Sequence, residues 1–233
     1  MRHSAARRRA AAMALAIAAL AAVGTEARAA DGGTEARAVA RPANEHGRIW
    51  TVSFQGDTLG QAPPYTIVRG GDWSVEADST APSGRVLRQR MNDDGVAWHY
   101  IQFLRPFLED VSVSVRFRIR SGAIDPSAGI LFQLDPKARN GYLVRLTGRT
   151  SEIAFHYILF GKRRDVRFGK IEWPAPDTWH TLALRRAGHR LSVQYDGREI
   201  LNVRDERYAK GTIGLWTEDD TVADFADLEV GVP

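Results

Sequence analysis

The stretch from Trp179 to Val230 reads WHTLALRRAGHRLSVQYDGREILNVRDERYAKGTIGLWTEDDTVADFADLEV. It consists of short runs in which apolar and polar residues alternate, and tight turns separate these runs. The pair Asp196-Gly197 lies between two runs of strand-forming composition, and Asp-Gly is typical of a hairpin turn because it tolerates positive φ at both central positions. Alternating runs joined by such turns predict an antiparallel β-sandwich.

The clearest alternation lies upstream, between Val111 and Ile119, where Val, Val, Val, Phe and Ile alternate with Ser, Ser, Arg and Arg. A period of two predicts a strand with one buried and one solvated face. Phe117 is then expected in the core, while Arg116, Arg118 and Arg120 form a stripe on the solvated face. The chain contains about thirteen such runs and no helical period after residue 29, which predicts an all-β, two-sheet antiparallel jelly-roll sandwich.

Residues 1–29 do not fit that fold. Three arginines at 7–9 precede an apolar run at 10–23, and Ala-Arg-Ala at 27–29 fits a signal-peptide cleavage site. The apolar run has about fourteen residues, fewer than the ~20 that a membrane-spanning helix needs. We therefore expect cleavage of a signal peptide and a periplasmic or secreted protein, without stable membrane insertion.

The rest of the chain divides into a predicted flexible linker at 30–47 and one folded domain at 48–233. The whole chain has 32 Lys+Arg and 28 Asp+Glu, of which residues 1–29 hold five and one. The remainder carries 32 − 5 = 27 basic and 28 − 1 = 27 acidic groups, so its net charge is zero. A nucleic-acid partner is not expected, because a basic footprint is missing. Cysteine is absent, which excludes thiolate metal sites and cysteine nucleophiles.

Five short motifs occur in an order that resembles a known fold: Ser121–Asp125, Ala128–Phe132, Tyr142–Arg145, Gly214–Thr217 and Phe225–Leu228. Their order resembles concanavalin A-like jelly rolls, the fold of legume lectins, laminin G domains and many glycan-active proteins. More narrowly, it is similar to the secreted 3-keto-disaccharide hydrolase-like family. The resemblance covers roughly Ile49 to Val230 and implies a glycan or oligosaccharide as ligand.

Carboxylate spacing bears on whether the protein is an enzyme. Family-sixteen glucanases, related to this fold, place their catalytic carboxylates as Glu-x-Asp-x-Glu or Glu-x-Asp-x-x-Glu. The chain contains neither pattern. A carbohydrate-binding sandwich of the cell envelope is therefore favoured. The alternative is a hydrolase or lyase acting on 3-keto-disaccharides or related glycosides, and a purely structural envelope protein also stays open.

Three neighbouring strands carry polar residues on the side expected to face away from the core, and aromatic residues could add a surface for the C–H face of a sugar. The candidate carbohydrate-binding residues are Gln133, Arg145, His156, Trp98, Tyr100 and Trp216. Each has a structural alternative: an ion-paired arginine, a structural histidine or a tryptophan packed in the core. The arginine stripe offers a second candidate surface, suited to an anionic glycan because guanidinium pairs with carboxylate in a bidentate manner.

The resemblance also implies a metal site. Concanavalin A-like sandwiches often bind a structural Ca²⁺ where their first and last strands meet, through carboxylate and carbonyl oxygens. Asp57 follows the first predicted strand and Asp227 lies in the last. These two residues are the candidate calcium ligands.

Overall fold

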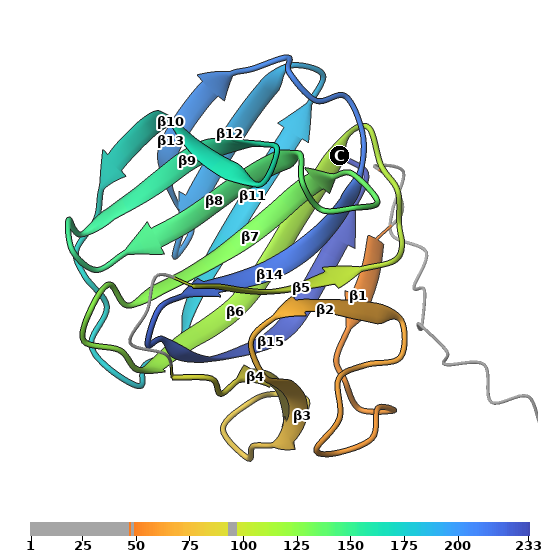
Figure 1. Ribbon diagram of the computed structural model, residues 1–233, viewed down its shortest axis with the longest axis vertical. Coiled ribbons are helices and arrows are strands. Elements are labelled where there is room, and N and C mark those ends of the chain that lie inside the picture. The colour runs from red at the N-terminus through yellow and green to blue at the C-terminus, as the bar shows by residue number, and fades with distance from the viewer. Residues whose placement is uncertain (1–46, 48, 93–96) are drawn as a thin grey trace, which may run out of the picture. The chain divides into compact units, whose positions relative to one another are not determined.

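The computed structural model describes residues 47, 49–92 and 97–233. Within these ranges the regular elements are 15 β-strands arranged as two antiparallel sheets (Figure 1). No helix able to cross a membrane is found in this part of the chain. The predicted two-sheet antiparallel sandwich is confirmed, whereas the predicted signal peptide at 1–29 lies outside the described residues.

The first sheet has eight strands, and the second has seven. The first sheet runs in the order β13 (Arg198–Arg204), β12 (Arg190–Tyr195), β11 (His180–Ala187), β6 (Val111–Ser121), β15 (Val222–Gly231), β4 (Arg85–Gln89) and β3 (Trp73–Ala77), and β1 (Ile49–Val52) pairs with β15. The second runs β10 (Lys162–Lys170), β9 (Glu152–Leu159), β8 (Gly141–Thr147), β7 (Ser127–Leu134), β14 (Thr212–Glu218), β5 (Trp98–Phe103) and β2 (Thr66–Gly70).

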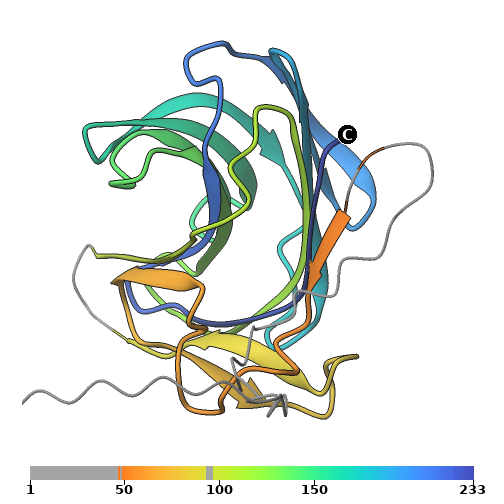
Figure 2. The same ribbon diagram turned by 90° about the vertical axis from the view of Figure 1, so that its right-hand side faces the viewer.

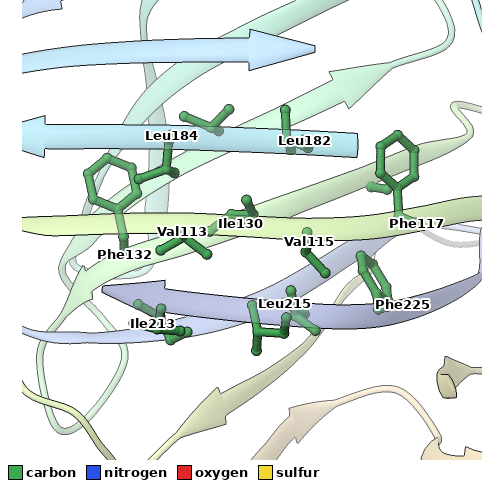
Figure 3. Close-up of a cluster of buried hydrophobic side chains, with 14 of the residues drawn as sticks. Val113, Val115, Phe117, Ile130, Phe132, Leu182, Leu184, Ile213, Leu215 and Phe225 are labelled. Atoms are coloured by element: carbon green, nitrogen blue, oxygen red, sulfur yellow. The ribbon is translucent and has the colours of Figure 1, made fainter. Parts of the chain in front are cut away.

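The core lies between the two sheets (Figure 3). Strand β6 contributes Val113, Val115 and Phe117, each at most 2% exposed, as the alternation predicted. They pack against side chains of β7 and β14 in the facing sheet, among them Phe132 and Leu215. Because a strand's side chains alternate between faces, the residues between these core positions face outward from the sandwich.

Turn chemistry agrees with the sequence at the hairpin between β12 and β13. Asp196 and Gly197 have φ values of 47° and 77°, which is the positive pair that a type I′ turn requires. Strand β2, at Thr66–Gly70, was not predicted. It is a short strand at the edge of the second sheet and directly follows a proline-containing loop, so its own sequence gives a weak signal.

The prediction that Arg118 lies on a solvated face of β6 is wrong. This side chain is 5% exposed and donates hydrogen bonds to Asp224 at 2.8 and 3.0 Å and to Asp78. Trp179 covers it, with the guanidinium carbon 4.7 Å from the ring centroid. The arginine stripe is therefore neutralised by carboxylates, and this removes the reason for assigning it an anionic glycan.

Candidate functional site

Five of the six candidate sugar-binding residues come from one face of the second sheet. We call this the curved face: the outward side of β5, β14, β7, β8, β9 and β10. Figure 2 shows that this sheet curls at its β10 end. Leu215 and Val144 point into the core, so their neighbours Trp216 and Arg145 point outward.

Strand register brings Arg145 and Trp216 together. Trp216 lies opposite Gly129 of β7, and Gly129 lies opposite Arg145 of β8. A Cβ atom at Gly129 would lie 2.7 Å from the Val144 carbonyl oxygen and 3.0 Å from the Arg145 Cβ. The glycine therefore leaves room for the arginine, whose guanidinium carbon lies 5.5 Å from the Trp216 ring centroid.

Two further aromatic side chains border this pair on strand β5. Trp98 meets Trp216 edge to face, with ring centroids 6.0 Å apart and an interplanar angle of 80°. Tyr100 lies directly opposite Trp216 in the register. Trp216 is fully buried, whereas Trp98 and Tyr100 are partly exposed. The curved face thus has accessible aromatic surface on β5, and Phe168 of β10, 44% exposed and with its ring centroid 5.9 Å from that of His156, adds to it.

Glu218, at the end of β14, joins the charged groups of the curved face. Its carboxylate accepts hydrogen bonds from Arg145 Nη1 at 3.0 Å, from Arg163 Nη1 at 3.0 and 3.1 Å, and from Trp98 Nε1 at 3.1 Å. Sequence reasoning missed both Glu218 and Arg163. These partners come from three other strands, β8, β10 and β5, so no local motif shows the cluster.

A second carboxylate supports Arg145 from the loop before β7. Arg145 Nη1 donates to Asp125 at 3.2 Å, and Asp125 also accepts from the Thr147 hydroxyl at 2.9 Å and from the Arg149 backbone N–H at 3.1 Å. Burial, and then the positive charge of Arg163, lower the pKa of Arg145 from its usual value. Burial with two carboxylate partners makes Arg145 a rigid part of the face.

His156 lies diagonally from Arg145 on the neighbouring strand β9 and is 1% exposed. Burial, and then the charges of Arg163 and Arg145, lower its pKa to about 3, so the imidazole is neutral at neutral pH. Its Nδ1 lies 3.0 Å from the Asp165 carboxylate. Because a carboxylate only accepts, Nδ1 carries the proton and Nε2 is left as an acceptor.

Three buried polar atoms on the curved face have no hydrogen-bond partner among the described residues: Arg145 Nε, Trp216 Nε1 and His156 Nε2. The first two are N–H donors, and the third is the free acceptor of a neutral imidazole. An unpaired buried polar group costs about 1–3 kcal/mol, so such groups need a partner. Water or a hydroxyl-bearing ligand could pair with all three.

Gln133 does not share the curved face with the other candidates. It has a φ of 49° at an irregularity in the β7–β14 pairing, which interrupts the alternation of side chains. Its Nε2 donates to the carbonyl oxygens of Glu109 and Ala209, at 2.7 and 2.9 Å. Gln133 therefore ties two loops together and is separate from Arg145 and His156.

The predicted calcium ligands do not form a cation site. Asp57 accepts a hydrogen bond from the Tyr65 hydroxyl at 2.7 Å, and Asp227 lies 3.6 Å from an Arg116 guanidinium nitrogen. Calcium prefers six to eight oxygen ligands, and an arginine beside a carboxylate opposes a second cation. Within 49–92 and 97–233, no group of three or more His, Cys, Asp or Glu side chains could hold a metal ion.

A hollow on the outer face of the first sheet is a contrasting surface. It has a volume of ≈ 270 Å³, and its lining includes Ser112, Ser114, Ala183 and Ser192. None of its lining side chains has a buried atom without a partner. It also has no aromatic side chain in its lining. The unpaired polar atoms beside aromatic rings thus distinguish the curved face from this hollow.

Comparison with known proteins identifies the fold. Neither a protein-family profile nor a curated protein sequence matches the chain. Among solved structures, the carbohydrate-binding module CBM66 from Bacillus subtilis matches with a TM-score of 0.60 and 19% identity, over 71% of this chain and 94% of the module. The fold is a concanavalin A-like β-sandwich. No sequence match supports the narrower resemblance to the 3-keto-disaccharide hydrolase-like family.

Two other solved structures have the same lectin-like sandwich. The exoplasmic/lumenal domain of VIP36, bound to Ca²⁺ and Man3GlcNAc, matches with a TM-score of 0.54 and 15% identity, over 73% of this chain and 84% of that domain. A Bacillus subtilis protein of unknown function with a galectin-like fold matches with a TM-score of 0.53 and 16% identity, over 72% and 90%. At these identities the likeness is one of fold.

Proposed function

We propose that the protein is a secreted carbohydrate-binding β-sandwich and that its glycan ligand contacts the curved face. The observation that carries the proposal is the set of three buried, unpartnered polar atoms next to partly exposed aromatic rings. The lectin-like fold supports it, since CBM66 and the VIP36 domain are themselves described as binding carbohydrate or mannose-containing sugars.

The chemistry of the face suits a sugar. A hydroxyl group can donate one hydrogen bond and accept others, so it matches both the N–H donors of Arg145 and Trp216 and the acceptor of His156. Ligand sites typically combine such polar groups with an apolar lining. Trp98 and Tyr100 offer that lining for the C–H face of a pyranose or furanose ring.

The structure gives no separate support for the hydrolase or lyase alternative. Glu218 and Asp125 are the two carboxylates that hold Arg145. Guanidinium, indole, hydroxyl and backbone N–H donors occupy their oxygens. Carboxylates held in this way position other groups and are poorly placed to exchange protons with a substrate. The proposed export, and with it the periplasmic or extracellular location, is supported by the sequence of residues 1–29 alone.

Replacing Trp98 with alanine tests this function. We expect Trp98→Ala to weaken binding of a glycan found by screening about tenfold, because a central aromatic contact contributes much of a binding energy. The measurement is isothermal titration calorimetry of both proteins with the same oligosaccharide. Phe107→Ala is the matched control, since Phe107 is a 50% exposed aromatic residue in the loop between β5 and β6. Equal losses in both variants, or none in Trp98→Ala, would contradict the proposal.

A further inference from the structure

Arg163 makes a contact that a flat sheet would not allow. It belongs to the edge strand β10, and Glu218 belongs to β14, four positions away in the order β10-β9-β8-β7-β14. Neighbouring strands lie about 4.8 Å apart, so a flat sheet would separate these two strands by roughly 19 Å. The Arg163–Glu218 nitrogen–oxygen distance is 3.0 Å. The curl visible in Figure 2 thus carries β10 over the curved face.

The Arg163 side chain lies over the two tryptophan rings of the curved face. Its guanidinium carbon lies 5.7 Å from the Trp98 ring centroid and 6.0 Å from that of Trp216. The Arg163 side chain is 24% exposed, whereas those of Arg145 and His156 are 8% and 2% exposed. Arg163 is therefore the solvent-facing layer over Trp216 and Glu218, while Phe168 of β10, 44% exposed, meets the His156 ring edge to face with centroids 5.9 Å apart.

We propose that Arg163 is a displaceable clasp over the curved face and that the ligand it admits is a neutral, hydroxyl-bearing sugar. The inference rests on the proposed function and deepens it. When Arg163 leaves Glu218, the hydroxyl groups of the sugar reach Arg145 Nε, Trp216 Nε1 and His156 Nε2.

The charges around the site select against an acidic sugar. Two guanidinium groups, those of Arg145 and Arg163, face three carboxylates, those of Glu218, Asp125 and Asp165. A carboxylate or sulfate group of an acidic sugar would meet this excess of negative charge, and that group could not donate a hydrogen bond to His156 Nε2. A neutral hydroxyl can do so, and it avoids the repulsion.

The clasp makes binding weaker than it would be with an open face. The apparent affinity equals the affinity of the open state multiplied by the fraction of molecules in which the clasp is open. A change that favours the open state therefore raises the apparent affinity. The Arg163 side of the Arg163–Glu218 ion pair is partly exposed, and ion pairs of this kind contribute little to the stability of the closed state. Removing Arg163 should tighten binding about five- to tenfold, while Glu218 keeps its bonds to Arg145 and Trp98.

Calorimetry of three proteins tests the clasp: wild type, Arg163→Ala and the control Arg164→Ala. Arg164 is exposed and neighbours Arg163 on β10, and its register partner is Tyr157, whereas Arg163 lies opposite Ile158. The probes are neutral gluco-, manno- and fructo-oligosaccharides and oligogalacturonates of matched length. We expect Arg163→Ala to bind a neutral oligosaccharide about five- to tenfold more tightly, Arg164→Ala to match wild type, and oligogalacturonates to bind to none of the three.

The outcomes separate the clasp from the function. If Arg163→Ala binds the sugar more weakly than wild type does, Arg163 is a ligand contact. The clasp is then wrong, and the glycan-binding function stands. Tighter binding of oligogalacturonates than of neutral sugars would overturn the assigned ligand class. Absence of binding in both wild type and Arg163→Ala would overturn the proposed function itself. Arg163→Gln, which keeps a polar side chain but is shorter and uncharged, replaces Arg163→Ala if the alanine variant melts at a lower temperature.

Discussion

Asp224→Ala should lower the free energy of unfolding by about 3–5 kcal/mol, because it leaves buried charge without its partner. Asp224 is 0% exposed and accepts hydrogen bonds from Arg88 at 2.5 and 2.9 Å and from Arg118 at 2.8 and 3.0 Å. Arg120 lies 3.5 Å away. Without the carboxylate, three guanidinium groups would repel one another, and Arg118 would keep Asp78 and Asp177 as carboxylate partners and Thr80 as a neutral one.

Urea unfolding followed by tryptophan fluorescence measures this effect. The matched control is Asp227→Ala on the same strand, β15. Asp227 is partly exposed and lies 3.6 Å from Arg116, so its loss should change stability by about 0–1 kcal/mol. Similar midpoints for Asp224→Ala and wild type would show that the arginine network is solvated and that the assigned burial of Arg118 is wrong.

Arg145→Ala should lower the free energy of unfolding by about 3 kcal/mol and also abolish glycan binding. It removes the guanidinium shared by Glu218 and Asp125, two buried carboxylates on the curved face. The sequence named Arg145 as a candidate sugar-binding residue, with an ion-paired arginine as the structural alternative. Its burial and its two carboxylate partners predict a loss of stability as well as of binding.

Thermal melting and calorimetry on the same samples test both halves of this prediction. Arg164→Ala should stay within about 0.5 kcal/mol of wild type, as surface substitutions usually do. An Arg145→Ala protein with wild-type stability would refute the ion-pair assignment. One that is fully folded and binds glycan normally would exclude Arg145 from the site.

The alternation in β6 predicted the core correctly because it is a local property. Val111 to Phe117 repeat every second residue, and a strand with that repeat can bury only one face at a time. The same alternation placed Arg118 in solvent, wrongly. Its partners Asp224 and Asp78 are 106 and 40 residues away, so only the folded sheet brings the carboxylates to it.

The candidate site was partly predictable for a similar reason. Gln133, Arg145 and His156 were assigned to one face from strand alternation, and register places Arg145 and His156 there together with Trp216, which was named as an aromatic candidate. Glu218 was missed because its partners Arg145 and Arg163 come from other strands, so no local pattern indicates the cluster. Gln133 was misplaced because a residue with a φ of 49° breaks the alternation, and its own sequence does not signal this.

The most direct test of glycan binding at the curved face is nuclear magnetic resonance of the tryptophan indole N–H groups during titration with a neutral oligosaccharide. The chain has six tryptophans, so each indole signal can be assigned by substitution. Trp216 Nε1 has no partner among the described residues, and Trp98 Nε1 donates to Glu218. We expect the signals of Trp216 and Trp98 to shift on binding, while those of Trp73, on edge strand β3 of the first sheet, and Trp179, directly before β11 of the same sheet, stay unchanged. Shifts at Trp179 together with the backbone of β6 and β11, and none at Trp98 or Trp216, would contradict glycan binding at the curved face.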